Sequence, residues 1–244
     1  MSKERDIRVS APATTPRHYL ATLSVPAPLG TSTLPAQIHE SLEEAIIRGD
    51  IAPGSRLRAD DIASHYGVSR IPVREALSSL HEAGWVGIRP RYGVYVRERS
   101  EAELTELFEA RSGIEGYIAG LAAERRRDEN VAELTRIVSH TKDAAAQKDV
   151  DALSLASVEF NAALRATAHN TVLAAVSLGL EKRARFYFSP IAGLIGDEWV
   201  ESQARLVDFI TRGQAEEASA SARQHIVQTG EAVARLLGDV SFSS

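Results

Sequence analysis

The stretch from Asp60 to Ala83, DDIASHYGVSRIPVREALSSLHEA, constrains the fold of this chain more than any other. Its pattern predicts two short helices joined by a tight turn at Gly67, because glycine readily adopts the left-handed conformation that ends a helix. Ser69 suits the N-cap of the second helix, where its hydroxyl accepts a hydrogen bond from an otherwise unpaired N–H. Pro72 then falls in the first turn, where no helical N–H is needed.

The second helix of this pair combines one apolar stripe with two cations. Val73, Leu77 and Leu80 recur at i, i+4 and i+7, which predicts a buried stripe. Arg70 and Arg74 lie one turn apart near the helix N-terminus and should project away from that stripe. A helix that presents two guanidinium groups from its N-terminal half suits the major groove of DNA. The pattern indicates a helix-turn-helix, with a simple helical hairpin carrying two solvated arginines as the alternative.

The residues that follow favour the helix-turn-helix. The run WVGIRPRYGVYV, residues 85–96, predicts two short strands around a basic turn. Two helices followed by a basic hairpin form the winged variant of the motif. In that arrangement Arg89 or Arg91 reaches the adjacent backbone or minor groove.

The run PGSRLRADDIASHYGVSRIPVREALSSLHEAGWV, followed by RPRYGVYV, resembles the DNA-binding domain of the GntR family of bacterial transcription regulators. The resemblance covers about Leu34 to Val96, and VSRIPVREAL is its most specific part. It implies that Arg70 and Arg74 touch DNA while Arg58 and the wing assist. The complete set of DNA-contacting residues that we expect is Arg58, Ser69, Arg70, Pro72, Arg74, Arg89, Arg91, Tyr92 and Gly93. Some family members carry an arginine where this chain has Asp60, so we expect no base contact from the first helix of the pair.

The charge of the chain is divided unevenly. The formal net charge is −5, but residues 1–99 hold 13 Lys and Arg against 11 Asp and Glu, leaving +2 there and −7 in the remainder. From Ile51 to Arg99 there are eight arginines against five acids. Contact with phosphates requires such local positive charge, so we expect the N-terminal part to bind DNA and the acidic part to stay off it.

Composition also narrows the class of protein. The chain has no cysteine, which excludes disulfides and thiolate metal sites and suits a reducing compartment. No segment approaches the ~20 apolar residues of a membrane span, and the start MSKERDIRVS lacks the apolar core of a signal peptide. We expect a cytoplasmic protein with no membrane partner.

The pattern along the chain predicts an arm and two domains. Residues 1–31 contain four prolines and no sustained periodicity, which predicts a flexible arm. The winged helix-turn-helix domain should span 32–97, beginning with a helix from Thr33 that Gly49 ends. After the charged connector VRERS, Ser100 and Glu103 form a capping box that marks the start of a new helix. A second domain should therefore span 100–238.

The second domain shows only helical periodicity. The helices that we expect cover residues 101–126, 130–147, 150–168, 171–189, 197–212 and 215–237. Asn170 and Asp197 are suitable caps, and Gly213 and Gly238 suitable ends. The predicted fold is mainly α: an N-terminal winged helix-turn-helix followed by an all-α helical bundle.

A helical bundle after a GntR-type domain resembles the FadR subfamily, whose C-terminal ligand-binding and dimerisation domain is named FCD. The local matches are EARSGIE at 109–115, the segment around Phe160 and RQH at 223–225. Many FCD domains hold a divalent metal through one Asp and three His, the first two in a D-x-x-F-H run. The positions of this chain that match those ligands are Ser157, Asn161, Gln203 and His225. One imidazole among a hydroxyl and two amides is a poor site for zinc or nickel, so we predict that the metal site is lost and that no cofactor is bound.

A cavity that persisted at these four positions would be polar and nearly neutral. Arg111 either points inward and binds a carboxylate or phosphate, or pairs with Glu115 on an outer face. Arg183 and Arg185, beside three aromatic residues, supply either a second anion contact or a packed helix end. His140 and His169 have no partner at ligand spacing, so surface or capping roles are expected for both.

The leading hypothesis is a dimeric transcription regulator, expected to be a repressor, whose second domain senses a small acidic metabolite. Two identical reading helices one DNA turn apart match a palindromic operator. A ligand-independent repressor with a relic site is the alternative. An enzyme is disfavoured because the sequence holds no Gly-rich phosphate loop, nucleophile elbow, H-E-x-x-H motif or cysteine nucleophile.

Overall fold

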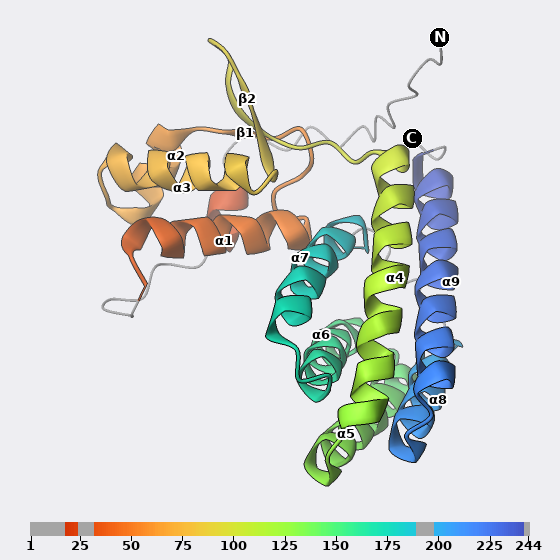
Figure 1. The fold of residues 1–244 in the computed structure, drawn as a ribbon. Helices are drawn as coiled ribbons and strands as arrows, with labels where there is room; N and C mark the ends of the chain where they lie inside the picture. The colour runs from red at the N-terminus through yellow and green to blue at the C-terminus, as the bar shows by residue number, and fades with distance from the viewer. Residues whose placement is uncertain (1–17, 24–31, 189–197, 242–244) are drawn as a thin grey trace. The chain divides into compact units, whose positions relative to one another are not determined.

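The computed structural model of the chain describes residues 18–23, 32–188 and 198–241. The chain forms two compact units, divided between Ser100 and Glu101 (Figure 1). Among the described residues, the first unit combines helices with one small sheet and the second contains helices alone. The expected fold class, a winged helix-turn-helix followed by an all-α domain, is confirmed.

The first unit follows the order helix, strand, two helices and a hairpin. Its elements are α1 (Leu34–Arg48), β1 (Arg56–Leu57), α2 (Ala59–Tyr66), α3 (Arg70–Glu82), β2 (Val86–Arg89) and β3 (Gly93–Val96). Gly67 ends α2 with φ of 66°, as the sequence predicts. α1 packs against α3, and Ile38, Leu42 and Leu80 are fully buried in the resulting core.

The three strands form an antiparallel sheet in the order β1-β3-β2. Trp85, just before β2, buries its ring and donates from Nε1 to Glu43 Oε1 of α1 at 2.8 Å. Burying a polar atom without a hydrogen-bond partner costs free energy, so this bond makes it possible to bury the indole ring in the core. It fixes the start of the hairpin against the helical layer.

The N-terminal segment departs in part from the flexible arm expected for residues 1–31. Residues 18–22 form a short 3-10 helix, η1 (His18–Thr22), and Tyr19 and Leu23 are buried. Burial, followed by the nearby Asp61 carboxylate, raises the pKa of the Tyr19 hydroxyl, which places the ring beside the start of α2. Tyr19 and Leu23 supply the apolar surface that packs η1 against the unit. Residues 1–17 and 24–31 of the expected arm lie outside the described residues.

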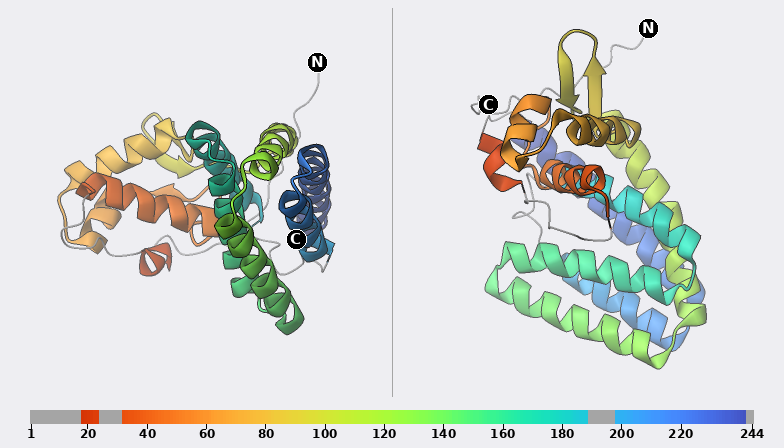
Figure 2. Two further views of the ribbon diagram at one scale, coloured as in Figure 1. Left: turned by 60° about the horizontal axis from the view of Figure 1, so that its bottom comes forward. Right: turned by 90° about the vertical axis from the view of Figure 1, so that its left-hand side faces the viewer.

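The second unit is built from helices that run back and forth. They are α4 (Glu101–Arg125), α5 (Asp128–Gln147), α6 (Val150–Thr167), α7 (Thr171–Phe188), α8 (Glu198–Arg212) and α9 (Ala215–Ser241). The long helices α4 and α9 lie side by side, and α5 pairs with α6 (Figure 2). Ile118, Leu134 and Ile210 are completely buried between these helices.

Two glycines allow the close approach of α4 and α9. A Cβ placed on Gly230 of α9 would lie 2.8 Å from Cγ of Phe108, and one on Gly116 of α4 would lie 2.5 Å from Cγ of Arg223. At either distance the added Cβ would force the neighbouring side chain to move. The register of this helix pair therefore depends on a missing side chain at each of two positions.

The helix boundaries in the second unit follow the sequence with one clear exception. Asn170 caps α7 as expected, accepting from the backbone N–H of Leu173 at 3.1 Å. Gly238 does not end α9, which continues to Ser241, because one glycine costs a packed helix only about 1 kcal/mol. The proposed cap Asp197 lies outside the described residues. In the described part of the chain, no helix has the length and apolar character needed to cross a membrane.

Candidate functional site

The N-terminal half of α3 presents two cations on the side opposite its buried stripe. Val73, Leu77 and Leu80 are buried against the rest of the unit, whereas Arg70 and Arg74 are exposed. Hydrophobic burial of one stripe thus fixes the opposite direction for the two guanidinium groups.

Ser69 occupies the N-cap position of α3, but its side chain makes no capping hydrogen bond. The expected hydroxyl bond is therefore wrong, although the position of the helix start is right. Pro72 lies in the first turn, where its missing N–H costs nothing. The first N–H groups of α3 have no capping side chain, and such groups are what an anion or phosphate binds at a helix N-terminus.

Arg70 has an acidic neighbour within the helix-turn-helix. Its Nε lies 2.8 Å from Oδ1 of Asp60 in the first turn of α2, and each side chain is 63% exposed. An ion pair this exposed contributes little to stability. The pair does keep the Arg70 guanidinium beside the Asp60 carboxylate. DNA phosphates and that carboxylate repel each other, so Arg70 must leave Asp60 to contact DNA. No ion pair joins Arg74 to any described residue.

The turn between β2 and β3 carries the expected basic wing. Arg91 has φ of 67° and Gly93 φ of 116°, which gives the turn its tight form. Tyr92 is 68% exposed at the tip. Arg89 stacks over the Tyr95 ring, with Cζ 4.6 Å from the ring centroid, so one of the wing cations is held by a cation–π contact.

Arg56 is a cation of this surface that the sequence did not single out. It lies on β1 directly opposite Tyr95 of β3, with its Cζ 6.0 Å from the ring centroid. A Cβ on Gly93 would lie 3.1 Å from Arg56 Nε, so this glycine also makes room for the arginine. The alternation of charged and apolar residues at Arg56, Leu57 and Arg58 was the available signal for a strand with two outward cations, and the structure shows these residues as exposed, buried and exposed.

A surface hollow lies between α3, the start of α2 and the sheet. Its lining includes the three cations Arg56, Arg58 and Arg74, together with Asp60 and Asp61. Arg58 stands at the N-cap position of α2 and is exposed. These arginines come from three different elements, which is why only the fold brings them to one surface.

The second unit contains a cavity of about 600 Å³ that is partly open to solvent. All four positions that the FCD resemblance had aligned with metal ligands lie in its wall: Ser157 and Asn161 of α6, Gln203 of α8 and His225 of α9. Gln203 is buried, and its Oε1 has no hydrogen-bond partner within the described chain. Helical spacing brings the first two to one face, but only the bundle adds the other two.

Arg111 of α4 also lines this cavity, which decides between its two alternatives. It is 5% exposed, with Cζ 5.3 Å from the centroid of the Phe108 ring. Its Nε is buried and has no hydrogen-bond partner among the described residues. Burial lowers the pKa of Arg111 while the carboxylates of Glu115 and Glu181 oppose that shift. A guanidinium remains charged under these conditions, so the cavity wall holds a desolvated cation.

The acids near Arg111 are engaged elsewhere. Glu115 is buried rather than on an outer face, and its Oε1 accepts from Ser177 Oγ at 2.7 Å. Glu181 forms a buried ion pair with Arg165. Glu181, Lys148 and Arg185 line the cavity as well. The nearly neutral character was expected of the four aligned positions alone; with Arg111, Lys148 and Arg185 the wall as a whole carries more cations than acids.

His225 is the only histidine in the described cavity wall. Its Nδ1 lies 2.7 Å from Ser202 Oγ, and its ring centroid lies 6.3 Å from that of Trp199. Burial, followed by the positive charge of Arg111, lowers the pKa of His225 to about 4. The imidazole is therefore neutral at physiological pH.

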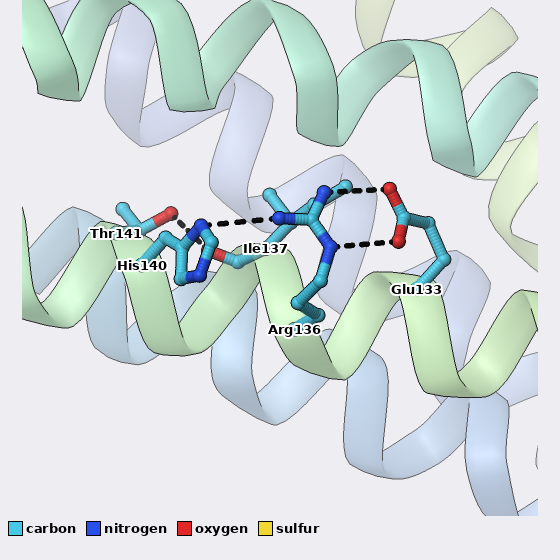
Figure 3. Close-up of polar contacts among 5 residues, drawn as sticks. All are labelled: Glu133, Arg136, Ile137, His140 and Thr141. Carbon is cyan, nitrogen blue, oxygen red and sulfur yellow. Dashed lines mark hydrogen bonds and ion pairs between the residues drawn. The ribbon is translucent and has the colours of Figure 1, made fainter.

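His140 and His169, the two other histidines considered as ligands, lie on the surface of the second unit. Figure 3 shows Arg136 of α5 between Glu133 and His140; its Nε and Nη2 donate to the Glu133 carboxylate at 2.8 and 2.7 Å. The Arg136 Nη1 lies 3.1 Å from His140 Nδ1, so this histidine belongs to an exposed polar row. His169 is exposed at the end of α6. Their surface roles were expected.

The basic end of α7 was expected to supply either an anion contact or a packed helix end, and it shows features of both. Phe186 and Tyr187 are buried, and Tyr187 Oη donates to Glu103 Oε2 at 2.9 Å. Arg183 lies 3.6 Å from Glu103, whereas Arg185 lines the cavity. Aromatic packing thus positions one arginine for the cavity.

Comparison with known proteins identifies both units. Residues 34–96 match the family described as "Bacterial regulatory proteins, gntR family", and residues 106–228 match the FCD domain. The probable D-xylose utilization operon transcriptional repressor of Paenarthrobacter nicotinovorans is 28% identical over 214 residues, which cover 87% of this chain and 94% of that protein. The HTH-type transcriptional repressor RspR of Escherichia coli (strain K12) is 32% identical over 121 residues, or 50% of this chain and 53% of that protein.

Solved structures show the same fold. Escherichia coli McbR/YncC matches with a TM-score of 0.74 at 21% identity, over 84% of this chain and 99% of that one. A transcriptional regulator GntR from Rhodococcus sp. RHA1 matches with a TM-score of 0.69 at 22% identity, over 83% and 98%. The gntR family and the two named relatives are transcription regulators rather than enzymes. The chain therefore belongs to the GntR family of bacterial regulatory proteins, as a DNA-binding transcription regulator of the FadR type with an FCD domain.

Proposed function

We propose that this regulator is a repressor that reads its operator with Arg70 and Arg74 of α3, helped by the wing, and leaves DNA when a small organic acid fills the cavity of the second unit. The observation that carries the DNA-reading part is the exposure of both arginines on the N-terminal half of α3, opposite its buried stripe. Bidentate arginine contacts to guanine are the commonest specific contacts in the major groove.

Each predicted contact has its own part in this proposal. Arg74, unpaired, contacts a base edge, and Arg70 joins it after leaving Asp60. Arg58, Arg89 and Arg91 contact phosphates, which fixes the orientation on the duplex. We expect backbone groups around Ser69 and Pro72, at the start of α3, and around Tyr92 and Gly93, in the wing turn, to complete the contacts with DNA.

Arg74→Ala tests the reading role. The expected result is a 5- to 150-fold loss of affinity for an operator selected from random-sequence DNA, since one good base contact contributes about 1–3 kcal/mol. Arg136→Ala is the matched control, because it removes an exposed arginine of the second unit. Fluorescence anisotropy at one fixed salt concentration measures both. Equal affinity of Arg74→Ala and wild type would show that α3 does not read DNA.

The proposed effector follows from the unpaired groups in the cavity wall. Arg111 Nε is a buried donor without a partner, and Gln203 Oε1 is a buried acceptor without one, in both cases among the described residues. Ser157, Asn161 and His225 add further polar groups. Buried polar groups favour ligands that pair them, so the effector should carry a carboxylate and a hydrogen-bond donor.

The operator response tests the sensing role. In a mobility-shift assay, a small organic acid from the cell in which this regulator occurs should release the protein from the selected operator. Cell extract serves as the unbiased source of candidates, and extract with its small molecules removed is the control. A complex that ignores every acid and the complete extract would favour the ligand-independent repressor. The volume of the cavity, about 600 Å³, favours the sensor, because it is within the range of small-molecule sites.

GntR-type regulators are typically dimers, and we propose that this one binds a palindromic operator as a dimer. The exposed face of α7 carries Val172 and Val176, which are 73% and 47% exposed, and α4 exposes Tyr117. An apolar face of this kind suits a second copy of the chain. A footprint on the selected operator should show two related half-sites one DNA turn apart, and a single protected half-site would contradict the proposal.

A further inference from the structure

We propose that the cavity of the second unit is a metal-independent anion site, in which the buried guanidinium of Arg111 supplies the positive charge that binds a ligand carboxylate. This inference rests on the proposed function, which makes the cavity the effector site. It goes further by assigning the recognition to a fixed cation of the chain and by excluding a bound transition metal from it.

The residues present do not fit the divalent metal of the FCD fold. The four aligned positions converge on one cavity, but they supply a hydroxyl, two amides and one imidazole from Ser157, Asn161, Gln203 and His225. Zinc and nickel prefer imidazole, thiolate or carboxylate ligands. No three His, Cys, Asp or Glu side chains gather at a metal-binding distance anywhere in the described ranges.

The charge beside His225 also opposes a metal. The buried guanidinium of Arg111 lines the same cavity as His225. Its positive potential repels a divalent cation from the imidazole and attracts an anion. A buried guanidinium with an unpartnered Nε has both the charge and a free donor for a carboxylate.

The charged side chains of the wall favour an anionic ligand. Arg111, Lys148, Arg185 and Glu181 line the cavity, so the wall holds three cations and one acid. Glu181 forms a buried ion pair with Arg165. A ligand carboxylate therefore reduces the net positive charge of the wall.

The remainder of the lining defines the other end of the ligand. Phe188, Trp199 and Ile226 contribute apolar surface to the same cavity. A ligand that pairs its carboxylate with Arg111 places its body against these side chains. The ligand class is therefore a carboxylate with an aryl or alkyl body.

Isothermal titration of the full-length protein, treated with EDTA, tests the site with defined probes. Benzoate, 3-phenylpropionate and 3-phenyllactate are the carboxylates, and their primary amides are neutral controls of the same shape. We expect at least one carboxylate to bind at least tenfold more tightly than its amide. Zinc chloride alone should produce no binding in the cavity and should not strengthen carboxylate binding.

Three variants separate the role of Arg111 from general stability. Arg111→Met should weaken carboxylate binding at least tenfold, whereas Arg111→Lys, which keeps the charge, should lose less. Arg136→Gln removes an exposed cation of the same unit that does not line the cavity, and it should change affinity less than threefold. If Arg111→Met does not fold, the comparison of carboxylates with amides on the wild-type protein still shows whether the site recognises negative charge.

Carboxylate binding that disappears with EDTA and returns with zinc would overturn the proposal. So would amides that bind as well as the acids, or a complete absence of carboxylate binding. Release of operator DNA is measured separately. A carboxylate that binds through Arg111 without releasing DNA would refute the sensing function and leave the anion site intact.

Discussion

Lowering the pH from 7 to 5 should destabilise the second unit through His225. In the folded chain, burial and Arg111 lower the pKa of this imidazole to about 4, against 6.5 in the unfolded chain. Between these values the unfolded chain binds a proton that the folded chain does not, so stability falls as the pH falls through 6.5. The loss is complete below about pH 4. At pH 5 the two pKa values give a loss of about 2 kcal/mol relative to pH 7.

Urea unfolding of wild type and of His225→Gln, each at pH 7 and pH 5 with EDTA present, isolates this contribution. The variant also loses the contact with Ser202, but that loss is the same at both pH values and cancels in the comparison. Other titrating groups cancel in the same way. Wild type should therefore lose about 2 kcal/mol more than the variant on acidification. Equal losses would show that His225 titrates normally and that its surroundings are neither dry nor positive.

Two further substitutions test the first unit and the helix pair. Asp60→Asn breaks the exposed pair with Arg70, so unfolding should change by less than about 1 kcal/mol while DNA affinity rises severalfold; weaker DNA binding would show that Asp60 positions Arg70 instead. Gly230→Ala forces a Cβ against the Phe108 ring and should destabilise by about 1–3 kcal/mol in thermal unfolding. Gly238→Ala, in open space on the same helix, should stabilise by about 0.5–1 kcal/mol, and equal effects of the two alanines would contradict the close packing.

Local chemistry in the sequence was sufficient to place the elements of this fold. The turn at Gly67 and the cap at Asn170 each depend on a residue and its immediate neighbours, so both were predictable. Gly238 failed as a helix end because packing of α9 outweighs the small intrinsic cost of glycine. Tyr19 failed as part of a loose arm for a similar reason: burial of its ring against distant residues was not visible in the local composition.

The candidate sites were less predictable, because they depend on which elements meet. The spacing of Arg111 and Glu115 is equally compatible with an exposed ion pair and with two buried groups, and only Ser177, 62 residues away, shows where Glu115 finds its partner. Arg56 gains its place at the wing from pairing of β1 with Tyr95. Long-range contacts of this kind have no signature in a single sequence.

The position of Arg111 on α4 suggests why a ligand charge affects the whole regulator. α4 begins at Glu101, directly after the connector from the first unit, and it packs along α9. A carboxylate that pairs with Arg111 replaces an unpartnered donor by a charge-assisted hydrogen bond, and such a bond can differ in strength between two arrangements of the helix. Because coupling between two sites is at most this difference in binding free energy, we expect a neutral ligand of the same shape to shift α4 less than the carboxylate does. If the proposed sensing function holds, the charge of the effector, rather than its volume, should therefore decide how far DNA affinity changes, and a carboxylate and its amide that release the operator equally well would contradict this.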